Sequence, residues 1–237
     1  MLLARYTSCV VRSIVLSFLS AFLLSSAVEP TRAPVLVELF TSEGCSSCPP
    51  ADKLLEQLDP HVIVLSEHVD YWNHLGWKDR FSSHAFTQRQ EDYARQLHVD
   101  GPYTPQMVVD GATEFNGSDG ARAQQVLTAA AQRPKATVRI ARTATGLQVD
   151  VTDAPRSASV YLAVADNSDA SQVAAGENNG KQLRHVAVLR SLRKLGSVKK
   201  GSTFSQAIEL PAASQRAVIF VQESDQGAVD GAAVWAQ

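Results

Sequence analysis

The sequence is poor in cysteine. It has three cysteines in 237 residues, and one of them, Cys9, lies in an amino-terminal segment that we expect to be removed. A framework of several disulfides, which stabilises many small secreted domains, is therefore excluded. The other two, Cys45 and Cys48, are separated by only two residues. A ring this small removes little entropy from the unfolded chain, so stability alone is a weak reason for such a bond.

An excess of basic charge is missing as well. The chain has 22 lysines and arginines against 24 acidic residues. Removal of Arg5 and Arg12 with the amino-terminal segment leaves 20 basic residues, a net charge of −4 with neutral histidines. A nucleic acid is therefore not an expected partner, because its phosphates are bound by clustered positive charge.

The amino-terminal hydrophobic run is too short for a stable membrane span. Residues 14–24 are apolar, which is roughly half of the ~20 residues that cross a bilayer. Arg5 and Arg12 precede this run and small residues follow it at 25–27, a pattern typical of a cleaved secretory signal. We expect residues 1–27 to be a signal peptide, with an uncleaved anchor as the alternative. The mature protein is then periplasmic or secreted, with no stable membrane span.

The first part of the mature chain, residues 28–133, is predicted to be an α/β domain. An apolar, β-branched run at its start suits a strand buried on both faces. Pro49-Pro50 marks a helix start, because proline lacks a backbone N–H and the first helical turn does not use one. The first two strands should be parallel, since a right-handed crossover joins them, and Asp110-Gly111 predicts a later hairpin. The expected order is strand, helix, strand, helix, strand, strand and helix, at 35–40, 49–58, 61–69, 82–97, 107–109, 114–116 and 120–133.

Cys45 and Cys48 come between the first predicted strand and the helix start at Pro49. A helix amino end carries unpaired N–H groups and a positive dipole, which stabilise a thiolate and lower a cysteine pKa from ~8.5 to roughly 3.5–7.5. Disulfide exchange needs an attacking thiolate and a nearby resolving thiol. We predict Cys45 as the nucleophile and Cys48 as the resolver, with their disulfide as the redox group and no other cofactor. A purely structural disulfide is the alternative.

The carboxyl-terminal part, residues 134–237, is predicted to be an antiparallel β-sandwich-like domain. Its segments alternate between apolar and polar residues and are separated by Gly, Asn, Asp and Pro turns, with no helical period. The expected strands are at 137–142, 147–152, 159–164, 184–192, 203–210, 217–222 and 229–235. The side chains expected in the interior are Val160, Leu162, Val164, Val186, Val188, Ile208, Val218, Phe220 and Val234.

Four motifs carry a resemblance to a known family. The segments VELFTSEGCSSCPPAD, HVDYWNHLGWKDRFS, YTPQMVVDG and GENNGKQLRHVAVLR resemble the secreted domain-of-unknown-function family 1223, within the thioredoxin superfamily. The resemblance implies a thioredoxin-like domain followed by a β domain, and it implies no established activity. It also implies that Pro105 is cis, faces the cysteine pair and leaves the Thr104 backbone free to pair with a substrate strand.

The same resemblance assigns a role to Glu38. It corresponds approximately to the buried acid that thioredoxins keep behind the cysteine pair, and as a hypothesis it exchanges a proton with Cys48 through water. A satisfied edge or interface carboxylate is the alternative. The sequence departs from ordinary thioredoxins at Gly44, where an aromatic residue usually precedes the first cysteine, and at Pro49-Pro50.

Two further groups of residues are predicted to lie near the pair and to bind substrate. The second strand ends at His68, and ligands bind beyond the carboxyl ends of strands in parallel sheets. The residues predicted to bind substrate here are His68, Asp70, Trp72 and Trp77. A loop packed by its own aromatic residues is the alternative. The carboxyl-terminal part contributes Glu177, Asn178 and His185 from a loop that either leans over the cysteines or only turns a hairpin.

Metal binding is a weaker possibility. His68, His74, His84 and His98 could join the cysteines around copper or zinc, but no two of them share a helical i, i+4 or other tight ligand spacing. We assign no metal ligands. The preferred prediction is an extracytoplasmic thiol-disulfide oxidoreductase that acts on protein or small-thiol disulfides with a redox partner protein. It requires an accessible Cys45 sulfur next to Pro105. The alternatives are a non-catalytic secreted binding module and a copper or zinc carrier.

Overall fold

The computed structural model describes residues 34–236. The predicted signal peptide lies outside the described residues. The described residues belong to one compact unit. None of the helices in the described part of the chain is long and apolar enough to cross a membrane.

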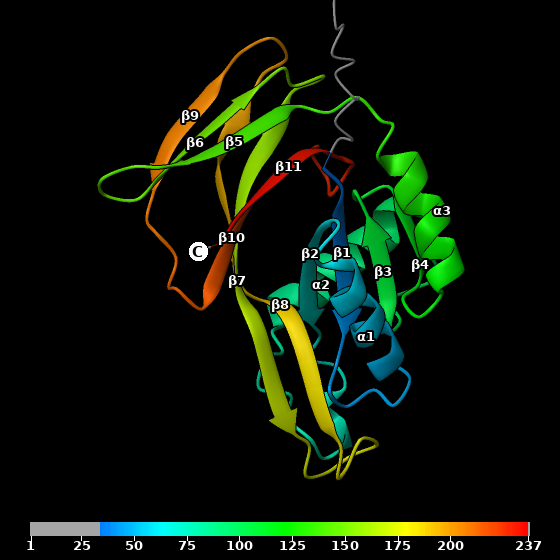
Figure 1. The fold of residues 1–237 in the computed structure, drawn as a ribbon. Coiled ribbons are helices and arrows are strands. Elements are labelled where there is room, and N and C mark those ends of the chain that lie inside the picture. The colour runs from blue at the N-terminus through cyan, green and yellow to red at the C-terminus, as the bar shows by residue number, and fades with distance from the viewer. Residues whose placement is uncertain (1–33, 237) are drawn as a thin grey trace, which may run out of the picture. The chain divides into compact units, whose positions relative to one another are not determined.

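The first part of the chain follows the predicted order of elements (Figure 1). Each boundary lies within three residues of the expected one, because apolar periodicity, Pro49-Pro50 and the turn residues all mark these elements clearly. The elements are β1 (Leu36–Thr41), α1 (Pro49–Leu58), β2 (Ile63–His68), the short 3-10 helix η1 (Asn73–Leu75), α2 (His84–Gln96), β3 (Gln106–Val109), β4 (Thr113–Asn116) and α3 (Gly120–Ala130).

The sheet around β1 is buried on both faces. β1 pairs in parallel with β2 and antiparallel with β3, and β3 and β4 form the predicted hairpin. Alternate residues of β1 point to opposite faces. Val37 and Leu39 pack with α1 and α3 on one face, whereas Leu36 and Phe40 pack with α2 on the other. The mixed α/β class is therefore confirmed, and Cys45 follows the end of a central strand.

The carboxyl-terminal part consists of strands, as predicted, but four of them extend the first sheet. The eight-stranded sheet has the order β11-β10-β7-β8-β2-β1-β3-β4, so strands from both sides of residues 133 and 134 share it. A parallel pairing of β8 with β2 joins the two parts, at Ser66 and Val188. The strands are β5 (Thr137–Arg142), β6 (Leu147–Thr152), β7 (Ala158–Gln172), β8 (Gln182–Val198), β9 (Phe204–Ile208), β10 (Gln215–Gln222) and β11 (Val229–Ala236).

β5, β6 and β9 form a second, three-stranded sheet. Its buried side chains, such as Leu147 and Val149, share one core cluster with Val160 of β7 and Ile219 of β10, so the two sheets pack against each other there. Most of the predicted interior residues are buried. Val164 is only half-buried, and Val234, on the edge strand β11, is 46% exposed.

Candidate functional site

Cys45 and Cys48 form a disulfide at the amino end of α1. Cys48 is the N-cap residue, and Pro49 and Pro50 occupy the first helical positions, where no backbone donor is needed. The backbone N–H of Cys45 donates to Ser42 at 3.1 Å and that of Cys48 donates to Cys45 at 3.2 Å. Consecutive turns therefore lead from β1 into the helix and hold the two α-carbons 5.4 Å apart.

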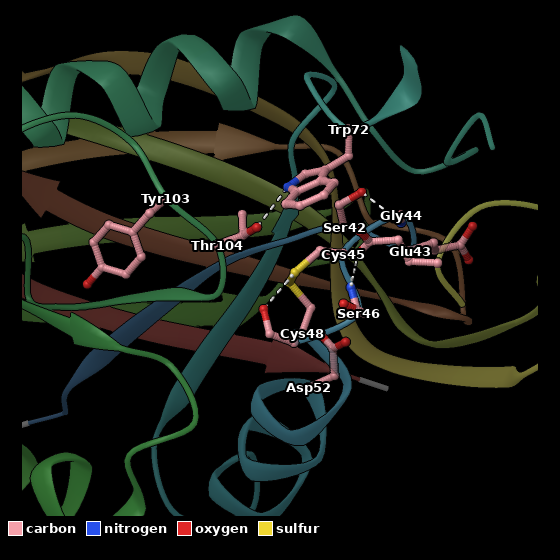
Figure 2. The surroundings of a disulfide bond; sticks show 12 residues. Ser42, Glu43, Gly44, Cys45, Ser46, Cys48, Asp52, Trp72, Tyr103 and Thr104 are labelled. Atoms are coloured by element: carbon pink, nitrogen blue, oxygen red, sulfur yellow. Dashed lines mark hydrogen bonds between the residues drawn. A yellow bond between two sulfur atoms is a disulfide. The ribbon is translucent and has the colours of Figure 1, made fainter. Parts of the chain in front are cut away.

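The disulfide is covered. Both cysteines are 0% exposed, although Ser46 and Ser47 between them are exposed. The expectation of an openly accessible Cys45 sulfur is therefore wrong for this conformation. The cover includes Trp72, which lies beside the disulfide and donates its indole N–H to Thr104 Oγ1 at 2.8 Å (Figure 2).

The position of Trp72 explains one departure from ordinary thioredoxins. A Cβ atom at Gly44 would stand 3.0 Å from the Trp72 Cβ, which is tighter than nearly all real contacts. An aromatic residue before the first cysteine would therefore require Trp72 to shift. In this chain the aromatic cover comes from the segment after β2 instead.

Thr104 and Pro105 come directly before β3. The Thr104–Pro105 peptide bond is cis. Pro105 is buried, and its carbonyl accepts a hydrogen bond from Gly117 at 2.9 Å. Thr104 is half-buried and stands beside the cysteine pair (Figure 2).

The loop between β7 and β8 leans over the cysteine segment. Asn178 is fully buried, and its side-chain amide donates to the carbonyls of Glu43 and Cys45, each at 2.9 Å. The exposed Glu177 accepts a hydrogen bond from the backbone N–H of Ser46 at 3.1 Å. Of the two alternatives for this loop, a simple hairpin turn does not account for these contacts.

Glu38 lies away from the predicted position behind the pair. It is fully buried, but its carboxylate accepts hydrogen bonds from Arg89 Nε at 2.7 Å and Tyr93 Oη at 2.5 Å, both on α2. α1, which Cys48 caps, packs on the opposite face of the sheet. The even-numbered position of Glu38 in β1 therefore turns its side chain away from Cys48.

A cluster of buried charged groups lies next to the cysteines instead, and we call it the His185 cluster. His185 of β8 has Nε2 3.7 Å from Glu43 Oε1 and Nδ1 3.7 Å from Asp52 Oδ1. All three residues are at most 6% exposed. Burial alone would lower the pKa of His185, but the carboxylates of Asp52 and Glu43 outweigh it and raise this pKa to about 10. His185 is therefore an imidazolium at neutral pH.

A second histidine-carboxylate pair packs against the His185 cluster. His68 Nδ1 lies 2.7 Å from Asp79 Oδ2, and the His68 ring meets the His185 ring edge-on at 4.6 Å between centroids. Burial would raise the pKa of Asp79, but His68 and two backbone N–H groups lower it overall. Trp77 joins the cluster by donating its indole N–H to Glu43 Oε2 at 2.7 Å.

The predicted residues thus divide into those that the fold brings to the cysteines and those that it does not. Glu38 points to α2, and Asp70 also faces that helix, because Thr87 Oγ1 donates to its carboxylate at 2.6 Å. The remaining predicted residues lie beside the pair or in the adjoining clusters: Trp72, Trp77, Thr104, Pro105, Glu177, Asn178, His68 and His185.

Sequence reasoning missed Glu43, Asp52 and Asp79. Asp52 had a usable signal, because it follows Cys48 by four residues on a helix and therefore lies on the same side of that helix. Glu43 and Asp79 lie in irregular segments, where spacing along the chain does not predict which side chains meet. Among the residues that the structure describes, no group of three or more His, Cys, Asp or Glu side chains is arranged to hold a metal ion.

The fold and site define a mixed α/β protein with a covered Cys-x-x-Cys disulfide at a helix amino end. Residues 36–222 match the family described as protein of unknown function (DUF1223), and the chain belongs to this family. The crystal structure of protein AGR_C_4864 from Agrobacterium tumefaciens is similar. It has 28% sequence identity and a TM-score of 0.76, over 88% of this chain and 96% of that one.

A more distant likeness concerns the fold alone. HBP35 of Porphyromonas gingivalis is 16% identical, with a TM-score of 0.53 over 86% of this chain and 75% of that one. No curated protein matches the chain.

Proposed function

We propose that this protein is an extracytoplasmic thiol-disulfide oxidoreductase that uses the Cys45–Cys48 pair on a thioredoxin-like framework. The observation that carries the proposal is the placement of the disulfide at the amino end of α1, next to Thr104. The order β1-α1-β2-α2-β3-β4-α3 supports the thioredoxin-like framework. A disulfide also fits an oxidising compartment, in agreement with a periplasmic or secreted protein.

The exchange reaction follows from the positions of the two sulfur atoms. A substrate thiolate attacks Cys45 Sγ, the Cys45–Cys48 bond breaks, and Cys48 leaves as a thiolate that takes up a proton. A second substrate thiolate then attacks the substrate sulfur of the mixed disulfide. Cys45 leaves as a thiolate, and two electrons have passed from the substrate to the pair. The reverse sequence reduces a substrate disulfide.

The amino end of α1 favours Cys45 as the thiol that exchanges with substrate. The positive end of the helix dipole stabilises a thiolate there. Ser47 Oγ lies 3.3 Å from Cys45 Sγ and can donate a hydrogen bond to it. Because Trp72 and the β7–β8 loop cover the pair, the substrate reaches Cys45 only after part of this cover moves.

The experiment is to measure the reduction potential of the pair and to trap partners with Cys48→Ala in the export compartment. We expect a potential between about −270 and −120 mV, the range of exchange proteins, and mixed disulfides through Cys45. Cys45→Ala/Cys48→Ala is the matched control and should trap nothing. A potential below about −300 mV together with no trapped partner would contradict the proposal.

A non-catalytic binding module with a structural disulfide is the second candidate. The observation in its favour is the complete burial of both cysteines. In that case the disulfide would resist reduction, and Cys45→Ala/Cys48→Ala would lower stability without changing partner binding. The same potential measurement therefore separates the two candidates.

A further inference from the structure

We propose that Asp52 is the group that exchanges a proton with Cys48, and that His185 positions Asp52 for this transfer. The inference rests on the proposed oxidoreductase function. Asp52 takes the role that the resemblance assigns to Glu38, whose side chain faces the other side of the sheet.

The position of Asp52 is the first argument. Cys48 caps α1 and Asp52 follows four residues later, so the two side chains lie on the same side of the helix, one turn apart. The Asp52 backbone N–H donates to the Cys48 carbonyl at 3.1 Å, and Figure 2 shows Asp52 among the side chains around the disulfide. Asp52 is 6% exposed, so bulk water does not replace it freely as the proton acceptor.

The hydrogen-bonding state of Asp52 is the second argument. Asp52 Oδ1 is buried and has no hydrogen-bond partner among the residues that the structure describes. An unpaired buried acceptor is costly, and such groups in proteins call for an explanation. Oδ1 faces His185 Nδ1 at 3.7 Å, beyond hydrogen-bond distance, so it keeps a lone pair that can receive and return a proton.

The surroundings of His185 are the third argument. Glu43 follows β1, Asp52 belongs to α1, and the His68–Asp79 pair comes from β2 and the segment after η1. Two further charges, Arg80 and Arg190, stack on the ring of Phe81, which contacts His185 edge-on. His185 faces both Asp52 and Glu43, and it offsets part of their charge.

The proton transfer takes place in the step that closes the disulfide. When Cys45 holds a mixed disulfide with a substrate sulfur, the Cys48 thiol gives its proton to the Asp52 carboxylate. The Cys48 thiolate attacks Cys45 Sγ, a new Cys45–Cys48 bond forms, and the substrate leaves as a thiolate. In the opposite direction Asp52 returns the proton to Cys48 as it leaves.

The test follows both cysteines in one reaction. Reduced protein is mixed with an aryl disulfide, 5,5′-dithiobis(2-nitrobenzoic acid), which releases one coloured thiolate when Cys45 attacks and a second when Cys48 closes the disulfide. Rates of both releases are measured from pH 5 to 10. Asp52→Asn is nearly isosteric and removes the proton acceptor. Glu56→Gln is the matched control, since Glu56 is one turn further along α1, is exposed and pairs with Arg184, the neighbour of His185.

We expect Asp52→Asn to slow the second release at pH 7 at least tenfold, as for the loss of a general base, and to leave the first release within about twofold. His185→Gln should move the rise of the second release to higher pH, a change that a purely structural role would not produce. Glu56→Gln should match the wild type. If Asp52→Asn and His185→Gln both show a normal first release and an unchanged second release, this inference is overturned and the proposed function stays intact. No first release in the wild type overturns both.

Discussion

Trp72 donates its indole N–H to Thr104 Oγ1 at 2.8 Å, and this hydrogen bond closes the space beside the disulfide between the segment after β2 and the segment before β3. The two residues are 32 positions apart in the chain. Because both residues lie outside the strands, this part of the cover can open without breaking a hydrogen bond of the sheet.

Trp72→Phe should therefore make the disulfide easier to reach. The variant keeps an aromatic ring but loses a hydrogen bond whose net contribution is about 0.5–1.5 kcal/mol. We expect reduction by dithiothreitol to be roughly two- to tenfold faster than in the wild type. Trp235→Phe, on β11 and far along the chain, is the control and should leave the rate unchanged. Equal rates for both variants would show that Trp72 does not limit access.

Asn178→Ala should lower stability considerably. The substitution leaves the buried Glu43 carbonyl without its side-chain donor, whereas the Cys45 carbonyl keeps the hydrogen bond from the Cys48 N–H. We expect a loss of about 1–3 kcal/mol in the free energy of unfolding in urea, the cost of one unsatisfied buried group. The neighbouring Asn179 is exposed, so Asn179→Ala should change the value by less than about 0.5 kcal/mol. Similar losses in the two variants would contradict the assignment.

The stability of the oxidised protein should fall between pH 6.5 and about 10. The pKa of His185 is raised from 6.5 to about 10, so folding holds a proton that the unfolded chain releases in this range. The stabilisation is complete below pH 6.5 and is lost as the pH rises through 10. It amounts to roughly 3–5 kcal/mol at ~1.4 kcal/mol per pKa unit. His185→Gln should flatten this part of the pH profile. A wild-type profile that is already flat would contradict the charged state of His185.

Glu67 should produce a similar fall that begins at lower pH. Burial is the main cause that raises its pKa, followed by the charge of Glu38, and Arg89 offsets only part of both. The folded protein therefore keeps a proton on Glu67 above its ordinary value of 4.5, and stability decreases as the pH rises from there. Glu67→Gln mimics the protonated acid and should remove this slope while leaving the fold unchanged. Urea unfolding at a series of pH values measures both profiles.

The sequence predicted most of the elements and the cysteine site, because these depend on local signals. Pro49-Pro50 marks the start of α1, the period of the apolar residues separates strands from helices, and Asp110-Gly111 marks the hairpin. The pairing of β8 with β2 rests on one register pair, Ser66 and Val188, and no local pattern indicates which edge a distant strand will join.

The same limit applies to the site. Glu38 was placed by analogy with a strand position, and the direction of its side chain depends on the register of β1, where a shift of one residue reverses the face. Gly44 was recognised as unusual, but its reason lies in the approach of Trp72, which is a tertiary contact. The His185 cluster joins residues from the segment after β1, from α1 and from β8, the adjoining pair adds His68 of β2, and only the folded sheet brings them together.

The contact between Asn178 and Cys45 spans 133 residues of the chain. Under the proposed export, amino end first, both thiols would emerge long before Asn178 and His185 follow. Oxidation of the pair can therefore precede the arrival of its cover and of its charged neighbours. The chemical character of the two sulfurs changes when the second half of the protein docks, so a truncated chain and the finished protein should differ in how readily they exchange electrons.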